Sequence, residues 1–205
     1  MESKKIMWKY FRFLFSLMIL GTQLILWIDS WTNGSLEALN FFGYWTNQGN
    51  ILGAIALLIS AKYTLKDRPF HIEIIRFIAT VNIVMVTVLY WSFVNGDDVG
   101  VRFLWANYMV HLITGLILLA DWIIEGPKIS VQMPNVYIAG FYPLFWLIVT
   151  GIRFLIDGWV PYAVLEPKNG FISIAVICLI FFISSFVFGT ILILLKRFRI
   201  LKPSL

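Results

Sequence analysis

Six apolar runs, separated by short segments rich in glycine, proline and charge, set the pattern of hydrophobic and polar positions along the chain. Each run approaches about 20 residues, the length at which an α-helix crosses the hydrocarbon core of a bilayer. Because the connections are short, neighbouring helices are expected to be adjacent and antiparallel. The sequence therefore predicts an all-α bundle of six transmembrane helices, forming a single integral membrane domain over residues 1–205. The predicted helices are Phe11–Ile28, Phe42–Ala61, Ile72–Val94, Phe103–Ile124, Tyr137–Ile156 and Phe171–Leu195.

Composition and the distribution of basic residues add an orientation to this bundle. The chain is 60% hydrophobic and only 13% charged, whereas a soluble domain carries about a quarter charged residues. Cytoplasmic segments of membrane proteins are enriched in Lys and Arg, so both termini are expected in the cytoplasm. The basic residues on the predicted inner side are Lys4, Lys5, Lys9, Arg12, Lys62, Lys66, Arg68, Arg76, Lys128, Lys196, Arg197, Arg199 and Lys202, against Arg102, Arg153 and Lys168 outside.

Several other classes of protein and site are excluded or disfavoured by the sequence. The basic, then apolar, N-terminus lacks a convincing small-x-small cleavage site, so it is interpreted as a retained first helix rather than a signal peptide. No basic stretch has the aromatic interleaving of a nucleic-acid site. Two histidines and one cysteine, Cys178, offer no convincing set of metal ligands. We therefore expect no nucleic-acid partner, no metal and no cofactor.

The second run opens with a cluster of hydrogen-bonding side chains, in the stretch "YWTNQGNIL". Thr46, Asn47, Gln48 and Asn50 all lie at its start, and Thr46 is expected about one turn below the outer surface. Polar side chains inside a span are costly and mark candidate functional positions. They also serve as hydrogen bonds between helices, and that structural interpretation stays open for each asparagine.

His111 lies among aliphatic residues in the fourth run, in "WANYMVHLITGLILLADW". It is about eight residues, or roughly 12 Å, into its helix, which also places it in the outer half of the membrane. Asn107 precedes it by four residues and shares its helix face. A neutral histidine can take the proton of a hydroxyl that attacks a carbonyl, so Thr46 and His111 form a candidate catalytic pair. The alternative is a structural histidine that bonds another helix; His71 is expected to be solvent-exposed.

Other polar residues also have a functional or a structural interpretation. Arg76 and Asp121 both lie near cytoplasmic helix ends, and we predict that they form a structural pair. Arg153 lies near the outer end of the fifth run, where it can reach the outer surface, bind Asp157 or hold a substrate carboxylate. Asn82 and Tyr90 in the third run are candidates for lining a cavity.

Three stretches carry a resemblance to a known family: "FGYWTNQGNIL", "MVHLITGLILLADW" and "FYPLFWLIVTGIRFLIDGWVPYAVLEP". Taken together, in order and spacing over nearly the whole chain, they resemble the androgen-induced and androgen-dependent membrane protein family, most closely its bacterial six-span relatives. The third stretch is the most specific, with Tyr-Pro opening the helix, an arginine near its end and a Gly-Trp-x-Pro-Tyr turn.

The resemblance implies an intramembrane hydrolase of a bacterial cell membrane. Animal members cleave fatty acid esters of hydroxy fatty acids with a threonine nucleophile and a histidine, and those two residues match Thr46 and His111. On this interpretation the partners are membrane lipids and an amphipathic acyl ester. Asn47, Gln48 and Asn50 are candidate oxyanion donors, and Asn107 is a candidate for orienting His111. The candidate substrate-binding residues are Arg153, Tyr90, Asn82, Trp159 and Tyr162.

Two other functions remain open at the level of sequence. A transporter of small solutes or lipids would use the same polar cavity for binding, although the sequence shows no internal repeat and no clearly broken helix pair. A non-catalytic scaffold would use Thr46 and His111 only as hydrogen bonds between helices.

Overall fold

Helices make up all the regular secondary structure in the described part of the chain. The computed structural model describes residues 2–33, 39–64, 68–94, 102–127, 131–198 and 200–201. Asp97 and Asp98, which the sequence places in a loop, lie outside these residues, as do Lys66, Lys128, Arg199 and Lys202 of the predicted inner side. The α-helices are α1 (Glu2–Thr32), α2 (Trp45–Lys62), α3 (Phe70–Leu89), α4 (Leu104–Tyr108), α5 (Thr114–Ile124), α6 (Phe141–Asp157) and α7 (Phe171–Leu195).

Shorter helical segments extend or connect these helices. Two of them are π-helical: η2 (Tyr90–Val94) continues α3, and η3 (Met109–Ile113) joins α4 to α5. The others are 3₁₀-helices: η1 (Asn40–Gly43), η4 (Met133–Gly140), η5 (Ala163–Leu165), η6 (Pro167–Asn169) and η7 (Lys196–Phe198).

Five helices in the described residues are long and apolar enough to cross a membrane. They are Ser3–Thr32, Phe70–Ser92, Leu104–Ile124, Met133–Asp157 and Phe171–Phe198. The first helix is longer than the predicted Phe11–Ile28, because the basic N-terminal turns are also helical. The sixth predicted span, Phe42–Ala61, corresponds to α2, an 18-residue helix that is not among the five. Its first turns carry Thr46, Asn47, Gln48 and Asn50, which lower its mean hydropathy.

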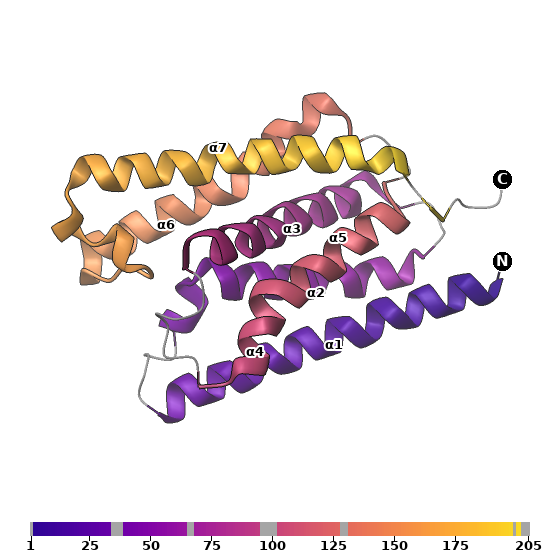
Figure 1. Ribbon diagram of the computed structural model, residues 1–205, viewed down its shortest axis with the longest axis horizontal. Helices are drawn as coiled ribbons and strands as arrows, with labels where there is room; N and C mark the ends of the chain where they lie inside the picture. The colour runs from indigo at the N-terminus through magenta and orange to yellow at the C-terminus, as the bar shows by residue number, and fades with distance from the viewer. Residues whose placement is uncertain are drawn as a thin grey trace.

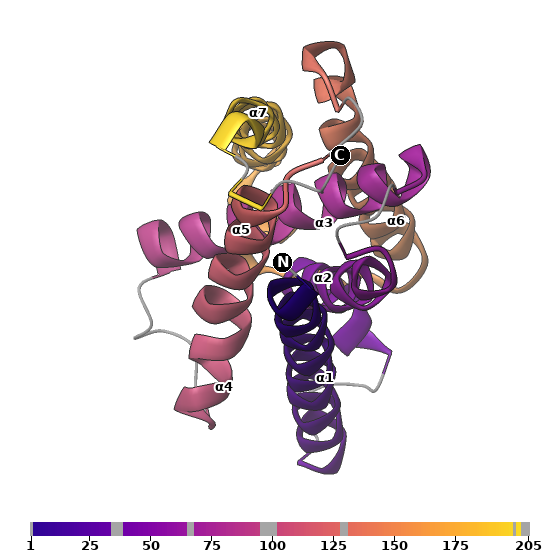
Figure 2. The ribbon, with the colours of Figure 1, turned by 90° about the vertical axis from the view of Figure 1, so that its right-hand side faces the viewer.

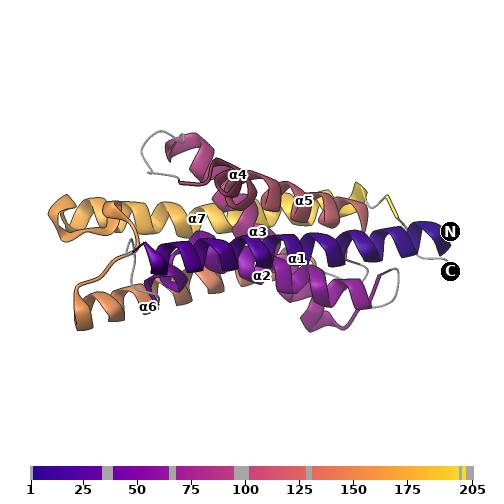
Figure 3. The same cartoon turned by 90° about the horizontal axis from the view of Figure 1, so that it is seen from below.

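Successive long segments run antiparallel along a common axis (Figure 1). Helix α2 packs between α1 and α3, and α6 and α7 lie on the far side of α3 from α1 (Figures 1 and 2). The start of α1 and the end of α7 lie at the same end of the bundle (Figures 1 and 3). At that end Leu201 N donates to Ile124 O at 2.8 Å, and Trp122 Nε1 donates to Leu192 O at 2.7 Å. These bonds join the last turns of α5 and α7.

Six buried charged side chains form a closed ring of alternating ion pairs at the same end. Asp121 of α5 lies 2.7 Å from Arg12 of α1 and 2.6 Å from Arg76 of α3, its predicted partner. Arg76 continues to Glu73 at 2.8 Å, and Glu73 to Arg68 at 2.9 Å. Glu125, which follows the last residue of α5, then pairs with both Arg68 and Arg12, and this closes the ring. Each residue is at most 3% exposed, so the ring joins α1, α3 and α5 through charges that water does not screen.

Helices α3 and α5 approach closely at Gly115, where a side chain does not fit. A Cβ at Gly115 would collide with the Thr87 side chain and lie 3.3 Å from the Ile83 carbonyl oxygen. Thr87 is held in place because its Oγ1 donates to Ile83 O at 3.0 Å. The glycine therefore sets the distance between the two helices.

Gly115→Ala is expected to destabilise the protein by about 1–3 kcal/mol, because the added methyl group overpacks this contact. Thermal unfolding in detergent measures the effect, and Thr87→Ala in the same chain should recover most of the loss. Gly151→Ala is the control, since a Cβ there meets nothing within 4 Å. Equal melting temperatures for Gly115→Ala and Gly151→Ala would contradict the prediction.

Candidate functional site

The start of α2 is fixed by its own polar side chains. Tyr44 precedes the helix in an extended conformation, and η1 lies just before it. Asn47 Nδ2 donates to Phe41 O at 2.8 Å, and Gln48 Nε2 donates to Phe42 O at 2.6 Å. The two amides thus fold the chain back against η1. One N–H of each amide is therefore engaged with the backbone, and the sequence makes both residues candidate oxyanion donors.

Thr46 lies in the first turn of α2, against a tyrosine from a distant segment. The first N–H groups of a helix have no partner within the helix, and Thr46 N donates to the Tyr162 hydroxyl at 3.4 Å. The Tyr162 ring packs edge-on against Tyr44, with centroids 5.5 Å apart, and lies 6.0 Å from Trp146. The segment after α6 therefore covers the beginning of α2.

Helix α6 and the segment that follows it form one wall of this region. Trp146 Nε1 donates to Gly43 O at 2.9 Å, and Tyr142 OH donates to Gln48 Oε1 at 2.6 Å. The Trp159 ring lies directly over Gly43, where a Cβ would collide with it. These contacts fix the start of α2 on α6.

Arg153, a candidate substrate ligand, is occupied in this structure. Its guanidinium pairs with Asp157 at 2.5 Å and lies over the Trp159 ring at 4.5 Å from the centroid. Of the alternatives drawn from the sequence, the structure contains the local ion pair. Since Trp159 covers Gly43, Arg153 contributes to the site through this ring.

His111 lies in the π-helical segment η3. It packs against η2, the π-helical segment that continues α3. Its imidazole stacks on the Tyr90 ring, with centroids 3.6 Å apart and an angle of 8° between the planes. Its Nδ1 is buried and has no hydrogen-bond partner in the described residues. Asn107 does not orient the imidazole directly; its Oδ1 accepts from Tyr90 OH at 2.9 Å. Asn107 therefore positions the ring on which His111 stacks.

Carbonyl groups of η3 accept hydrogen bonds from other side chains. A π-turn interrupts the regular helical bonding and is frequent at functional sites. Val110 O accepts from Asn50 Nδ2 at 3.0 Å, and His111 O accepts from Trp91 Nε1 at 3.1 Å. Thr114 Oγ1 donates to Met109 O at 2.8 Å. The backbone around His111 is thus held by side chains from α2, η2 and its own helix.

Asn50 connects the two halves of the candidate pair. The same Nδ2 that donates to Val110 O also donates to Thr46 O at 2.8 Å. The backbone of Thr46 and the residue next to His111 therefore meet at one nitrogen atom. No hydrogen bond joins the Thr46 and His111 side chains within the described part of the chain. Their direct contact remains an expectation.

Asn82 lies apart from these contacts. It is fully buried in α3, its Nδ2 donates to Ile78 O at 2.7 Å, and its Oδ1 has no partner among the described residues. His71 is exposed, as expected, but it lies in the first turn of α3 rather than in a loop.

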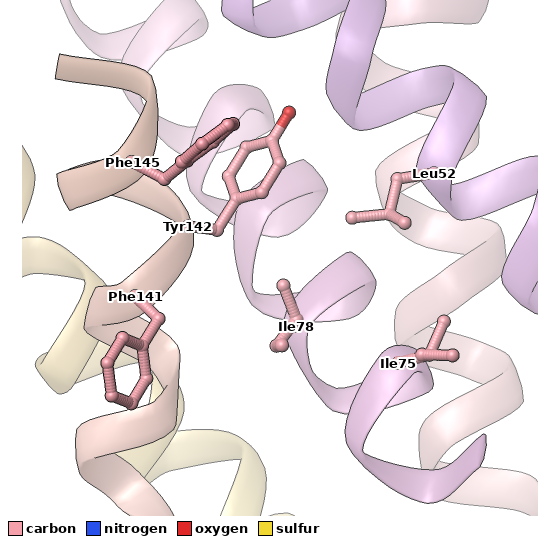
Figure 4. Close-up of a pocket in the computed structure, with 6 residues that line it drawn as sticks. All are labelled: Leu52, Ile75, Ile78, Phe141, Tyr142 and Phe145. Carbon is pink, nitrogen blue, oxygen red and sulfur yellow. The ribbon is translucent and has the colours of Figure 1, made fainter. Parts of the chain in front are cut away.

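Two apolar cavities lie beside α6. In the smaller, of about 300 Å³, Tyr142 and Phe145 of α6 face Leu52 of α2 and Ile78 of α3 (Figure 4). The larger, of about 450 Å³, lies between α6, α7 and the segment that connects them. Its lining includes Val160 and Leu165, which flank Tyr162 in sequence. The larger cavity therefore adjoins the segment that covers the start of α2.

Sequence reasoning missed the role of several residues. Tyr142 and Tyr44 contact the site, but only the tyrosine-proline opening of the fifth run drew attention to that helix. Arg12 and Arg68 were used only to predict the orientation of the bundle in the membrane. No prediction was made for Glu73 or Glu125. Asp121 and Glu125, two carboxylates four residues apart at the end of an apolar run, are the signal that could have indicated the ring.

Comparison of the chain with protein-family models, with curated proteins and with solved structures finds no match.

Proposed function

We propose that this protein is an intramembrane hydrolase of amphipathic acyl esters such as fatty acid esters of hydroxy fatty acids, with Thr46 as nucleophile and His111 as general base. The observation that carries the proposal is the Asn50 bridge. One buried amide nitrogen bonds the carbonyl of Thr46 and the carbonyl next to His111. Further support comes from the buried Nδ1 of His111, which has no hydrogen-bond partner among the described residues and can bond to the nucleophile.

The chemistry follows the general course of a hydroxyl nucleophile assisted by a base. The Thr46 oxygen forms a bond with the ester carbonyl carbon while His111 takes the hydroxyl proton. The tetrahedral intermediate collapses, the C–O bond to the alcohol breaks, and His111 gives its proton to the departing alkoxide. Water then attacks the acyl-threonine with His111 again as base, which releases the fatty acid and regenerates the hydroxyl.

A six-span topology in the plasma membrane of a bacterium, with both termini cytoplasmic, forms part of the proposal. Helix α2 packs between two apolar helices and runs antiparallel to both, and both ends of the described chain lie at one end of the bundle. An even number of crossings accounts for that placement. Thr46 would then lie near the outer headgroup level, with the apolar cavity between α6 and α7 open to an acyl chain.

Intact-protein mass spectrometry after exposure to a fluorophosphonate tests the proposal. Wild-type protein is expected to gain one phosphonyl adduct, which peptide mapping should place on Thr46, because the probe reacts with activated hydroxyl groups. Thr46→Ala and His111→Ala should both lose the adduct while keeping the wild-type melting behaviour.

Matched controls separate reactivity from folding. Thr22→Ala removes a buried threonine whose Oγ1 donates to Met18 O of its own helix and to no other group among the described residues. His71→Ala removes the other, exposed histidine. Both variants should label like wild type. Labelling of folded Thr46→Ala at the wild-type level, or hydrolysis that survives in it, would refute the hydrolase proposal.

A further inference from the structure

The Tyr162 hydroxyl is hydrogen-bonded to Thr46, but it has no part in the reaction steps proposed for Thr46 and His111. Its oxygen accepts from Thr46 N at 3.4 Å. Burial raises the pKa of Tyr162 to about 12, while hydrogen bonds from the Thr46 side chain and backbone and from the Trp45 backbone act in the opposite direction. The phenol therefore stays protonated at neutral pH and keeps an O–H group beside Thr46.

The phenolic hydrogen of Tyr162 lies beside Thr46. A tyrosine hydroxyl can accept and donate at the same time. Tyr162 accepts from the Thr46 amide and is also hydrogen-bonded to the Thr46 hydroxyl, and in the described part of the chain it donates to no residue other than Thr46. By contrast, the neighbouring amides of Asn47 and Gln48 already donate to the Phe41 and Phe42 carbonyls. The buried Nε1 of Trp45 also has no hydrogen-bond partner among the described residues, but the Tyr162 hydroxyl is the donor that is hydrogen-bonded to Thr46 itself.

We infer that Tyr162 is a catalytic residue that donates a hydrogen bond to the oxyanion formed when Thr46 attacks the ester carbonyl. This inference rests on the proposed hydrolase function and adds a donor to it. The carbonyl oxygen becomes negatively charged as the Thr46 oxygen bonds to the carbon, and a donor close to the nucleophile stabilises that charge. The rings of Tyr44 and Trp146 hold the phenol in place, so the donor is positioned before the substrate arrives.

Tyr162→Phe tests the donor, because it keeps the ring contacts and removes only the hydroxyl. Loss of one oxyanion donor should lower kcat for an acyl ester by about 100-fold or more, with little change in KM. The rate of phosphonylation of Thr46 should fall in parallel. A residue that merely caps α2 would change the melting temperature and leave kcat in place.

Tyr10→Phe is the matched control. It removes a phenol hydroxyl from an exposed tyrosine of α1 that has no part in the site, and it should keep kcat within about threefold of wild type. Active wild type together with a Tyr162→Phe variant of unchanged kcat would overturn the assignment of Tyr162 alone. Wild type without hydrolysis or labelling would overturn the hydrolase proposal and this assignment with it.

A second variant covers the case in which Tyr162→Phe does not fold. Replacing Tyr162 with 3-fluorotyrosine keeps the hydroxyl and nearly the same volume, but makes the phenol more acidic. A stronger donor should raise kcat while the melting temperature stays constant. Unchanged kcat in the folded fluorotyrosine protein would contradict the role of Tyr162 as a donor.

Discussion

Thr46→Ala and His111→Ala are each expected to lower kcat for ester hydrolysis by at least about 10³-fold, and the double variant by no more than the worse single one. In the proposed mechanism the nucleophile and the base act in the same proton transfer, so removing either one should abolish the step that both serve. Two residues with independent structural roles would instead give losses that multiply. The combination of variants therefore tests whether the two side chains act together, which their hydrogen bonds do not establish.

Steady-state kinetics in detergent or in proteoliposomes measures these losses. Thr46→Ser is the informative control, because serine keeps a hydroxyl at the same position and should retain part of the activity. Multiplicative losses in the double variant would argue against a shared reaction step. Flux of a solute or lipid across proteoliposomes, without hydrolysis by wild type, would favour a transporter.

Asp121→Asn is expected to destabilise the protein by about 3–5 kcal/mol, the usual effect of removing one partner from a buried ion pair. Asp121 accepts from two arginines, at 2.7 and 2.6 Å, and is only 3% exposed. Without its charge, the ring holds three arginines against two carboxylates in a place that water does not reach. Cation–π contact of Arg76 with Trp122, at 5.6 Å, offsets little of this loss.

Denaturant-induced unfolding in mixed micelles measures the change in the free energy of unfolding. Asp157→Asn serves as the comparison, since its pair with Arg153 is partly exposed and such pairs contribute less than about 1 kcal/mol. Removing Arg76 and Asp121 together, both as leucine, leaves two arginines and two carboxylates and should cost less than Asp121→Asn alone. Equal stability of Asp121→Asn and Asp157→Asn would mean that the ring is not buried in the folded protein.

The positions of the long helices could be predicted from the sequence because apolar length is a direct physical requirement for a span, although five helices of the described residues, against six predicted, have the length and hydropathy to cross a membrane. The predicted run Phe171–Leu195 coincides with α7, and Phe103–Ile124 differs from the α4–α5 rod by one residue. Even α2, which is less apolar than the others, was placed within three residues at its start and one at its end. The polar first turns of α2 were expected from the sequence, and they lower the mean hydropathy of α2 below that of the other long helices.

Most contacts between helices could not be predicted in the same way, and the Arg76–Asp121 pair is the exception, because both charges lie at the same end of apolar runs. Depth in the membrane placed Thr46 and His111 in the same half, but it says nothing about which faces meet. The Asn50 bridge depends on a π-turn at His111 that shifts the helix face, and a local sequence pattern does not predict that turn. Tyr162 reaches Thr46 only because the segment after α6 folds back over the start of α2.

The ring of ion pairs constrains the order in which the chain can assemble in the membrane. Its residues come from α1, from the region that begins α3 and from the end of α5, so they are synthesised far apart. A nascent chain that ends before Asp121 carries all three arginines of the ring, Arg12, Arg68 and Arg76. Of the three carboxylates of the ring, it carries only that of Glu73. Such charges remain at the interface with water until partners arrive. Closure of the ring therefore follows insertion of the α4–α5 segment, and the first three helices can complete their packing only after that step.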